Sequence, residues 1–329
     1  MANVYITASV PFSSDFDYVR RMISQFHDLY ESCQASRHHL VSCSDDADLI
    51  IVVSESGARQ LRLRNSQLYR NRWSDIFLFE SGDTALPFVQ GIYPSIDSRM
   101  QAPYWTASMF YPIVCLDDSI GYDSNYNSCD LLFSFVGTAR NHSSRKRIME
   151  LRDASAYLRE PFNSDSLDQQ SRKAAYVEIM RRSKFVLCPR GVGASSMRLF
   201  ESMKIGRVPV IISDAWVAPA GPDWAQFSVR ITEREIETIP RRLHELEPRY
   251  EAMGRAARVA WEQWFDRTVA FNTCVDYCLE IKRQQSVHKK IFQRMIVFKN
   301  SYGQLVRPFY FKYYFLKPLL RDLRVLALD

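Results

Sequence analysis

The chain has 329 residues, of which 47% are hydrophobic and 24% are charged, and its formal net charge is +6 at pH 7. This composition excludes a disordered chain, and a chain of this length is expected to form two domains. The positive charge is concentrated in residues 288–329, where nine Lys and Arg accompany two Asp, so 34 basic residues face 35 acidic ones elsewhere.

Cysteine content and terminal patterns bear on the compartment. The seven cysteines are scattered and odd in number, which favours free thiols in a reducing environment, and their spacing does not match a zinc site. The N-terminus lacks the features of a signal peptide, and no run of about 18 apolar residues predicts a membrane span. We therefore expect a cytoplasmic protein.

The first part of the chain has the pattern of an α/β domain. A helix is predicted over residues 17–32, and residues 82–112, rich in proline and aromatic residues, are expected to form irregular surface loops. Buried parallel strands are predicted from apolar runs at residues 4–10, 48–53, 76–79 and 113–116. These elements predict a first domain over residues 1–125.

A second α/β series follows a polar linker predicted at residues 125–130. Thr232 and Glu235 have the spacing of a capping box for a helix that reaches Leu246, and helical pattern then runs to about residue 285 with a break near residues 265–267. Strands are predicted at 131–136, 184–187 and 208–212, and helices at 144–153 and 171–182. We expect a second domain over residues 126–270, then a helix and tail over residues 271–329.

Residues 183–214 are the most informative segment. Their pattern predicts an apolar strand, a turn with Gly191 and Gly193, a short amphipathic helix and a second apolar strand. This arrangement places a helix N-terminus beside the carboxyl end of a parallel sheet, where a phosphate or diphosphate binds. Glu201, one to two turns into the helix, is then in range of a ribose. The segment predicts a site for an activated nucleotide.

The same segment is similar to the signature of the exostosin-like glycosyltransferases, here in a bacterial-type member. The matching residues are Lys184-Phe185, Cys188-Pro189-Arg190-Gly191, Ser196-Met197-Arg198-Leu199-Phe200-Glu201, and Gly206-Arg207-Val208-Pro209-Val210-Ile211-Ile212-Ser213-Asp214, with an upstream Phe133-to-Gly137 strand followed by Arg145. The resemblance implies a GT-B fold of two facing Rossmann-like domains with a cleft between them. It also implies an acceptor-side first domain, and inverting sugar transfer from a nucleotide sugar, commonly a UDP-sugar.

The predicted donor site gathers on the second domain. Ser195 and Ser196 are expected to cap the helix and meet the diphosphate. A cation in the first helical turn opposes the helix dipole, so Arg198 favours an anionic ligand over an ordinary surface position. Glu201 is expected to bind the ribose, as the resemblance implies; an ion pair with Lys204 is the alternative. The predicted donor-binding residues are Gly137, Arg140, Arg145, Arg190, Gly191, Gly193, Ser195, Ser196, Arg198 and Glu201.

Catalysis requires an arginine and a general base. Arg145, with Arg140 as second choice, is expected to stabilise charge on the leaving diphosphate. The base should follow a strand of the first domain. The candidates are Asp15 and Asp17, Glu80 and Asp83, and Asp117 and Asp118; we expect Asp83 first and Glu80 second, and the alternative for both is a solvated turn.

No metal or other cofactor is expected. The Asp46-Ala-Asp48 sequence has the form of a metal-diphosphate motif, but it precedes a buried strand and is expected to cap a turn. Without a carboxylate pair near the phosphate loop, cationic side chains and the helix dipole are expected to neutralise the leaving group.

The basic tail interleaves nine aromatic residues with its cations. Such a segment either packs on the first domain or binds an anionic membrane surface, and nothing else in the chain favours nucleic acid. We favour a peripheral position at the inner face of the cytoplasmic membrane. The expected acceptor is a bacterial polysaccharide or a lipid-linked glycan.

Two alternatives remain open at this point. The first is another GT-B glycosyltransferase, but the glutamate pair of retaining enzymes is missing because Gly193 occupies the partner position of Glu201, and the fucosyltransferase motifs are absent. The second is a catalytically silent scaffold that binds nucleotides or glycans at the membrane.

Overall fold

The computed structural model describes residues 1–8, 16–54, 60, 63, 66–83, 85–161, 168–286, 289 and 292–293. The chain folds into two compact units. Unit 1 comprises Met1–Met109 and the described chain from Ala270 onward, and unit 2 comprises Phe110–Val269. The sequence-based division differs at residues 110–125, which the structure groups with unit 2. The tail from residue 294, Asp15 and the side chain of Asp17 lie outside the described residues.

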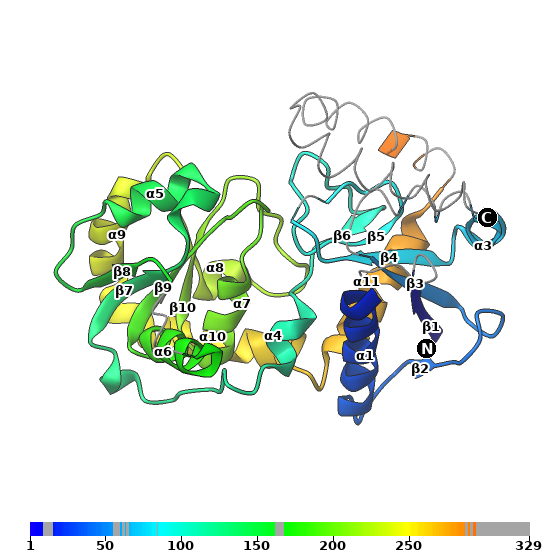
Figure 1. Cartoon of the computed structure of the whole chain (residues 1–329), viewed down its shortest axis with the longest axis horizontal. Coiled ribbons are helices and arrows are strands. Elements are labelled where there is room, and N and C mark those ends of the chain that lie inside the picture. Colours follow the sequence, from blue (N-terminus) through cyan, green and yellow to red (C-terminus); the bar gives the residue numbers. More distant parts are fainter. Residues whose placement is uncertain are drawn as a thin grey trace. The chain divides into compact units, whose positions relative to one another are not determined.

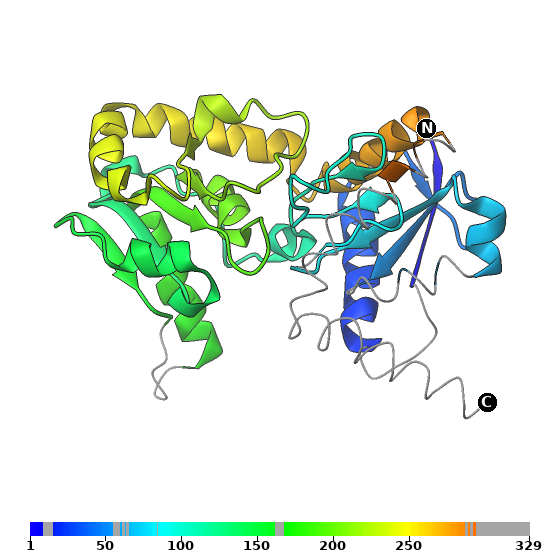
Figure 2. The ribbon, with the colours of Figure 1, turned by 90° about the horizontal axis from the view of Figure 1, so that it is seen from above.

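Unit 1 is built on a sheet whose described strands are all parallel, in the order β2-β1-β3-β4-β5-β6. Helix α1 packs against β1 and β3, and α11 packs against α1, β5 and β6 (Figures 1 and 2). The element bounds are β1 Asn3–Ala8, α1 Phe16–Ser32, β2 His39–Leu40, β3 Leu49–Ser54, α3 Gln67–Arg72, β4 Ile76–Glu80, β5 Gly91–Ile92, β6 Thr106–Ala107 and α11 Ala270–Gln284. The predicted strands at 48–53 and 76–79 and the helix at 17–32 are confirmed, and the strand predicted at 4–10 is confirmed over its described residues 4–8.

Unit 2 contains a second parallel sheet, in the order β11-β10-β9-β7-β8. Its bounds are α4 Pro112–Leu116, η1 Tyr126–Ser128, β7 Leu131–Val136, η2 Ala139–Asn141, α5 Ser143–Met149, β8 Ala156–Arg159, α6 Gln169–Arg181, β9 Ser183–Pro189, α7 Met197–Ile205, β10 Val208–Ile212, α8 Trp224–Phe227, β11 Val229–Arg230, η3 Ile236–Thr238, α9 Ile239–Leu246, η4 Glu247–Arg249 and α10 Tyr250–Trp264. The predicted α/β fold class with two Rossmann-like parallel-sheet units, the components of a GT-B fold, is confirmed.

The sheet of unit 2 is buried between helices. Continuous apolar runs make β9 and β10 interior strands, because a parallel sheet covered on both faces has no solvent side for polar residues. Helices α5 and α9 pack on one face, and α6 and α7 pack on the other (Figure 1). The core includes Phe133, Phe185, Val210 and Leu243, each fully buried. This core fixes the carboxyl ends of the strands.

Several predictions of local structure were wrong. Residues 113–116 form helix α4 and not a strand, because Pro112 starts a short helix and a short apolar run has no period of its own. Residues 82–112 contain β5 and β6, and most of the described ones are buried. The expected linker at 125–130 holds the buried Tyr126. The Thr232 hydroxyl donates to Glu235 Oε2 at 2.8 Å within a turn, so the pair caps no helix.

All seven cysteines lie among the described residues and form no disulfide. Within the described parts of the chain, none of the helices combines the length and the apolar composition that crossing a membrane requires.

Candidate functional site

The strand order of unit 2 creates a defined binding position. The chain runs from β7 outward to β8 and then crosses back to β9 on the other side of β7. The connections therefore diverge between β7 and β9, and ligands of open α/β sheets bind at the carboxyl edge of such a switch point. Gly137 follows β7 directly, and Arg190 and Gly191 follow β9. Predicted donor residues thus flank the switch point on both sides.

Helix α7 begins beside this edge. Ser196 occupies its N-cap position in an extended conformation, but the Ser196 side chain makes no capping hydrogen bond, which differs from the expected serine cap. Ser195, Ser196 and Gly193 are buried. The first turn of α7 presents the positive end of the helix dipole to the loop at residues 191–196.

Arg145 joins the two strand ends that form the switch point. It comes from α5 and is 8% exposed. Its Nε donates to the Arg190 carbonyl at 2.8 Å, and its two terminal nitrogens lie 3.4 Å from the carbonyl oxygens of Thr138 and Pro189. A Cβ atom at Gly191 would lie 3.0 Å from Arg145 Nη2, so glycine leaves this guanidinium more room than a larger residue would.

Arg198 approaches the same edge from α7. Its Nη2 and Nε donate to the carbonyl of Val136, the last residue of β7, at 2.6 and 3.1 Å. Its guanidinium lies 4.9 Å from the Phe135 ring centroid, and that of Arg145 lies 5.7 Å from the same ring. The sequence interpretation attributed this cation to an anionic ligand, whereas the structure gives it a backbone partner. The two arginines nevertheless concentrate positive charge beside the α7 N-terminus.

Glu201 is 5% exposed in the second turn of α7. Its carboxylate accepts a hydrogen bond from the Tyr176 hydroxyl and one from Lys173 Nζ at 3.2 Å. The alternative pair with Lys204 does not form: Lys204 Nζ instead donates to the carbonyl oxygens of Val114, Cys115 and Asp117 at 3.0, 3.0 and 2.7 Å.

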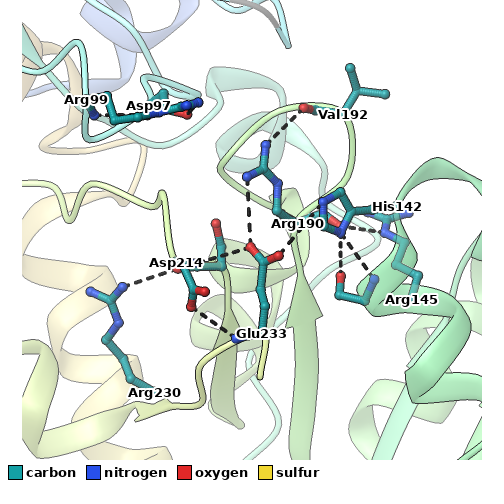
Figure 3. Close-up of polar contacts among 11 residues, drawn as sticks. Asp97, Arg99, His142, Arg145, Arg190, Val192, Asp214, Arg230 and Glu233 are labelled. Carbon is teal, nitrogen blue, oxygen red and sulfur yellow. Dashed lines mark hydrogen bonds and ion pairs between the residues drawn. The ribbon is translucent and has the colours of Figure 1, made fainter. Parts of the chain in front are cut away.

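Polar residues outside the predicted set extend the site along the sheet edge, as Figure 3 shows. The Asp214 backbone N–H donates to Glu233 Oε1 at 3.2 Å, and the Glu233 N–H donates to Asp214 Oδ1 at 3.0 Å. Glu233 also lies 3.9 Å from Arg190 Nη1 and 3.9 Å from His142 Nε2. His142, Asp214 and Glu233 each follow a strand within six residues, and that position is the signal that could have identified them.

The charges at this edge affect the pKa of His142. Burial, followed by the positive charges of Arg190 and Arg145, lowers the pKa of His142 below its usual value, although Glu233 opposes the shift. The imidazole is therefore neutral at pH 7. Its Nδ1 accepts the Ser144 backbone N–H at 3.2 Å and caps α5. Arg140, by contrast, is exposed in η2.

The candidate bases have contrasting environments. Glu80 ends β4 with 1% exposure, and burial raises its pKa to about 8 although Gln60 donates a hydrogen bond to it. Asp83 is exposed in the loop that follows β4. Asp117 and Asp118 belong to unit 2, where they form ion pairs with Lys173 and Arg267. Asp83 thus has the more accessible carboxylate of the two predicted first.

Within the described part of the chain, no group of three or more His, Cys, Asp and Glu residues could hold a metal ion. In the Asp46-Ala-Asp48 sequence, Asp48 Oδ2 accepts the Asn3 backbone N–H at 2.8 Å. This bond ties the start of β1 to the turn before β3.

Comparison with known proteins identifies the family. A model of the exostosin GT47 domain matches residues 70–246, just over half of the chain. The chain belongs to the exostosin GT47 family. This confirms the resemblance stated from the sequence and the glycosyltransferase class that goes with it.

Curated exostosin relatives match over shorter segments. The Exostosin-1 homolog of Caenorhabditis elegans is 39% identical over 67 residues, which cover 20% of this chain and 18% of that protein. Exostosin-1 of Drosophila melanogaster is 32% identical over 93 residues, 27% of this chain and 12% of its own. A probable glycosyltransferase of Arabidopsis thaliana is 40% identical over 78 residues, which cover 23% of this chain and 17% of that protein. The match spans less than a fifth of the length of each relative.

Solved structures give a more distant likeness. The crystal structure of Anabaena HepE in complex with UDP and glucose has a TM-score of 0.38 and 9% identity, over 85% of this chain and 99% of that one. WaaG, a glycosyltransferase involved in lipopolysaccharide biosynthesis, has a TM-score of 0.34 and 11% identity. The likeness covers 83% of this chain and 98% of WaaG.

Proposed function

We propose that this exostosin GT47 protein is an inverting glycosyltransferase that moves a sugar from a nucleotide sugar, a UDP-sugar in the first instance, to a polysaccharide or lipid-linked glycan. One observation carries the proposal. Gly137 and Arg145 from one segment of the sequence meet Gly191 and Arg198 from another at the switch point of unit 2, beside the N-terminus of α7.

The donor diphosphate would occupy this edge. Backbone N–H groups of the loop at 191–196 and the α7 dipole attract its negative charge. Arg145 and Arg198 supply two further positive charges at fixed positions, because backbone carbonyls hold both guanidiniums. Fixed cations stabilise the charge that develops on a leaving diphosphate. The reaction as proposed therefore uses no metal ion.

The nucleoside would extend along α7. Glu201 lies one helical turn beyond Arg198, on the same side of the helix, since residues three apart are neighbours on a helix surface. Its carboxylate would accept hydrogen bonds from the ribose hydroxyls. Asp83 is the proposed base, because Glu80 is buried and protonated at pH 7.

A thermal-shift screen of UDP, GDP, CMP and dTDP tests the nucleotide site without knowledge of the acceptor. We expect UDP to raise the melting temperature, and Glu201→Ala to reduce that increase by at least half because a charge-assisted hydrogen bond is lost. The exposed Glu178 of α6 supplies the matched control, Glu178→Ala.

An unchanged increase in the Glu201→Ala protein would remove Glu201 from the site. Failure of all four nucleotides to stabilise the wild-type protein would overturn the proposal. UDP binding without any UDP release from UDP-sugars would replace the enzyme with a nucleotide-binding scaffold.

A further inference from the structure

The Glu201 carboxylate is held by two side chains of the neighbouring helix α6. Lys173 donates to Glu201 Oε1, and the Tyr176 hydroxyl donates to Glu201 Oε2. Lys173 and Tyr176 are three residues apart on α6, so they share one face of that helix. Each carboxylate oxygen thus has one donor. About four acceptor positions exist on an ionised carboxylate, which leaves roughly two for a further partner.

Lys173 does not neutralise this site. Its Nζ also lies 3.1 Å from Asp117 Oδ2, so one ammonium serves two carboxylates. Asp117 is fixed in turn, because its Oδ1 accepts the Ser119 backbone N–H at 3.0 Å. Asp117, Lys173 and Glu201 together carry one net negative charge. The two carboxylates therefore suit a hydrogen-bond donor, such as a sugar hydroxyl, as a further partner.

Tyr176 contacts both functional side chains of α7. Its hydroxyl binds Glu201, and its ring centroid lies 5.8 Å from the Arg198 guanidinium. Burial first, and then the charge of Glu201, raise the pKa of Tyr176 well above its ordinary value. The phenol consequently stays protonated and acts only as a donor to Glu201. One side chain of α6 therefore lies beside both the cation and the carboxylate of α7.

We propose that Tyr176, assisted by Lys173, is a positioning residue that orients Glu201 to accept hydrogen bonds from both ribose hydroxyls of the donor nucleotide. The proposal rests on the nucleotide site proposed above and adds a specificity: this side of α7 distinguishes ribonucleotides from nucleotides that lack the 2′- and 3′-hydroxyls. Tyr176 acts through Glu201 and touches no reacting atom.

The test compares binding of UDP with binding of its 2′,3′-dideoxy analogue by calorimetry. We expect the wild-type protein to prefer UDP by about 100-fold, since two hydrogen bonds to a charged acceptor are lost in the analogue. Tyr176→Phe should reduce this preference about tenfold, and Lys173→Met should reduce it by a similar or smaller factor. Affinity for the dideoxy analogue should stay within about twofold, because the analogue makes no bond to Glu201.

Tyr157→Phe is the matched control. Tyr157 lies on β8, where its hydroxyl accepts from Arg159 at 3.4 Å, so its removal should leave the preference for UDP unchanged. If Tyr176→Phe and Lys173→Met weaken both ligands equally, or leave the preference at its wild-type value, the positioning role is wrong although the nucleotide site stands. If the wild-type protein binds neither ligand, the proposed function itself fails.

Discussion

The first three strands of each unit are arranged in the same order, but the chemistry at the strand ends differs. In both, the second strand lies outside the first, and the third lies on the other side of the first, so each unit has one switch point. In unit 2, arginines from two helices converge on the strand ends beside a helix N-terminus. In unit 1, strand β4 ends on Glu80, a buried carboxyl whose pKa is raised to about 8.

The strand order of a sheet therefore determines where a ligand can bind, and the side chains at that edge determine which ligand binds. A parallel sheet places loops at one edge whatever its sequence. Arg145 and Arg198 make that edge of unit 2 cationic, and small residues at 137 and 191 admit their guanidiniums. Substitutions in each unit test this contrast.

The largest effect is expected in unit 1, at Asp83. If Asp83 takes the acceptor proton, Asp83→Asn removes the base and should lower kcat by about 100- to 10,000-fold. UDP binding should not change, because the donor residues lie in unit 2. Steady-state rates of UDP release with an acceptor measure kcat, and calorimetry measures binding. Glu80→Gln is the matched control and should keep kcat within about threefold of wild type; the opposite pattern would transfer the role to Glu80.

In unit 2, Arg145→Lys should lower kcat/KM for the donor by about 100-fold. Lysine keeps the charge but loses the planar guanidinium that reaches the carbonyls of Arg190 and Thr138 together. Arg147→Lys on the same helix is the control, since Arg147 pairs with Glu237 instead. Equal activity of the two variants would show that this arginine does not stabilise the leaving group.

The smallest expected effect is on the free energy of unfolding, and it arises from Glu80 in unit 1. Because the folded-state pKa of Glu80 is raised to about 8, the folded protein retains a proton that the unfolded chain loses above its own pKa of about 4.3. Wild-type stability should therefore fall as pH rises between these values. Between pH 5 and pH 8, the loss should exceed that of Glu80→Gln by about 3 kcal/mol, measured by urea denaturation. Parallel pH profiles for the two proteins would contradict a protonated Glu80.

Much of the fold could be predicted from periodicity. The bounds predicted for β7 and β10 agree with the structure, because long apolar runs between turn residues have few alternatives. Helix α4 was missed since five residues are too few to show a helical period. Residues 82–112 were predicted to form surface loops, but most of the described ones are buried. Proline and aromatic residues do not distinguish the two cases, because they occur in exposed loops and in buried irregular segments alike.

The sequence predicted site residues only where they belong to one continuous motif. Gly191, Arg198 and Glu201 lie within eleven residues of each other, whereas Tyr176 and Lys173 reach Glu201 from a different helix. Their contact depends on the packing of α6 against α7, which a single sequence does not encode locally. The link between Glu233 and Asp214 has the same origin, since it joins two loops that follow different strands.

Gly137 and Gly191 each lie close to an arginine side chain, which limits the residues that fit at these two positions. Neither has the positive φ found at Gly91, Gly206 and Gly221, so their backbones would tolerate an ordinary residue. The space beside Gly137 is narrow, because an added Cβ atom would lie 2.7 Å from Arg198 Nη2 and 2.8 Å from Phe135 Cζ. Alanine at Gly137 would therefore move the end of the Arg198 side chain without changing any charged residue.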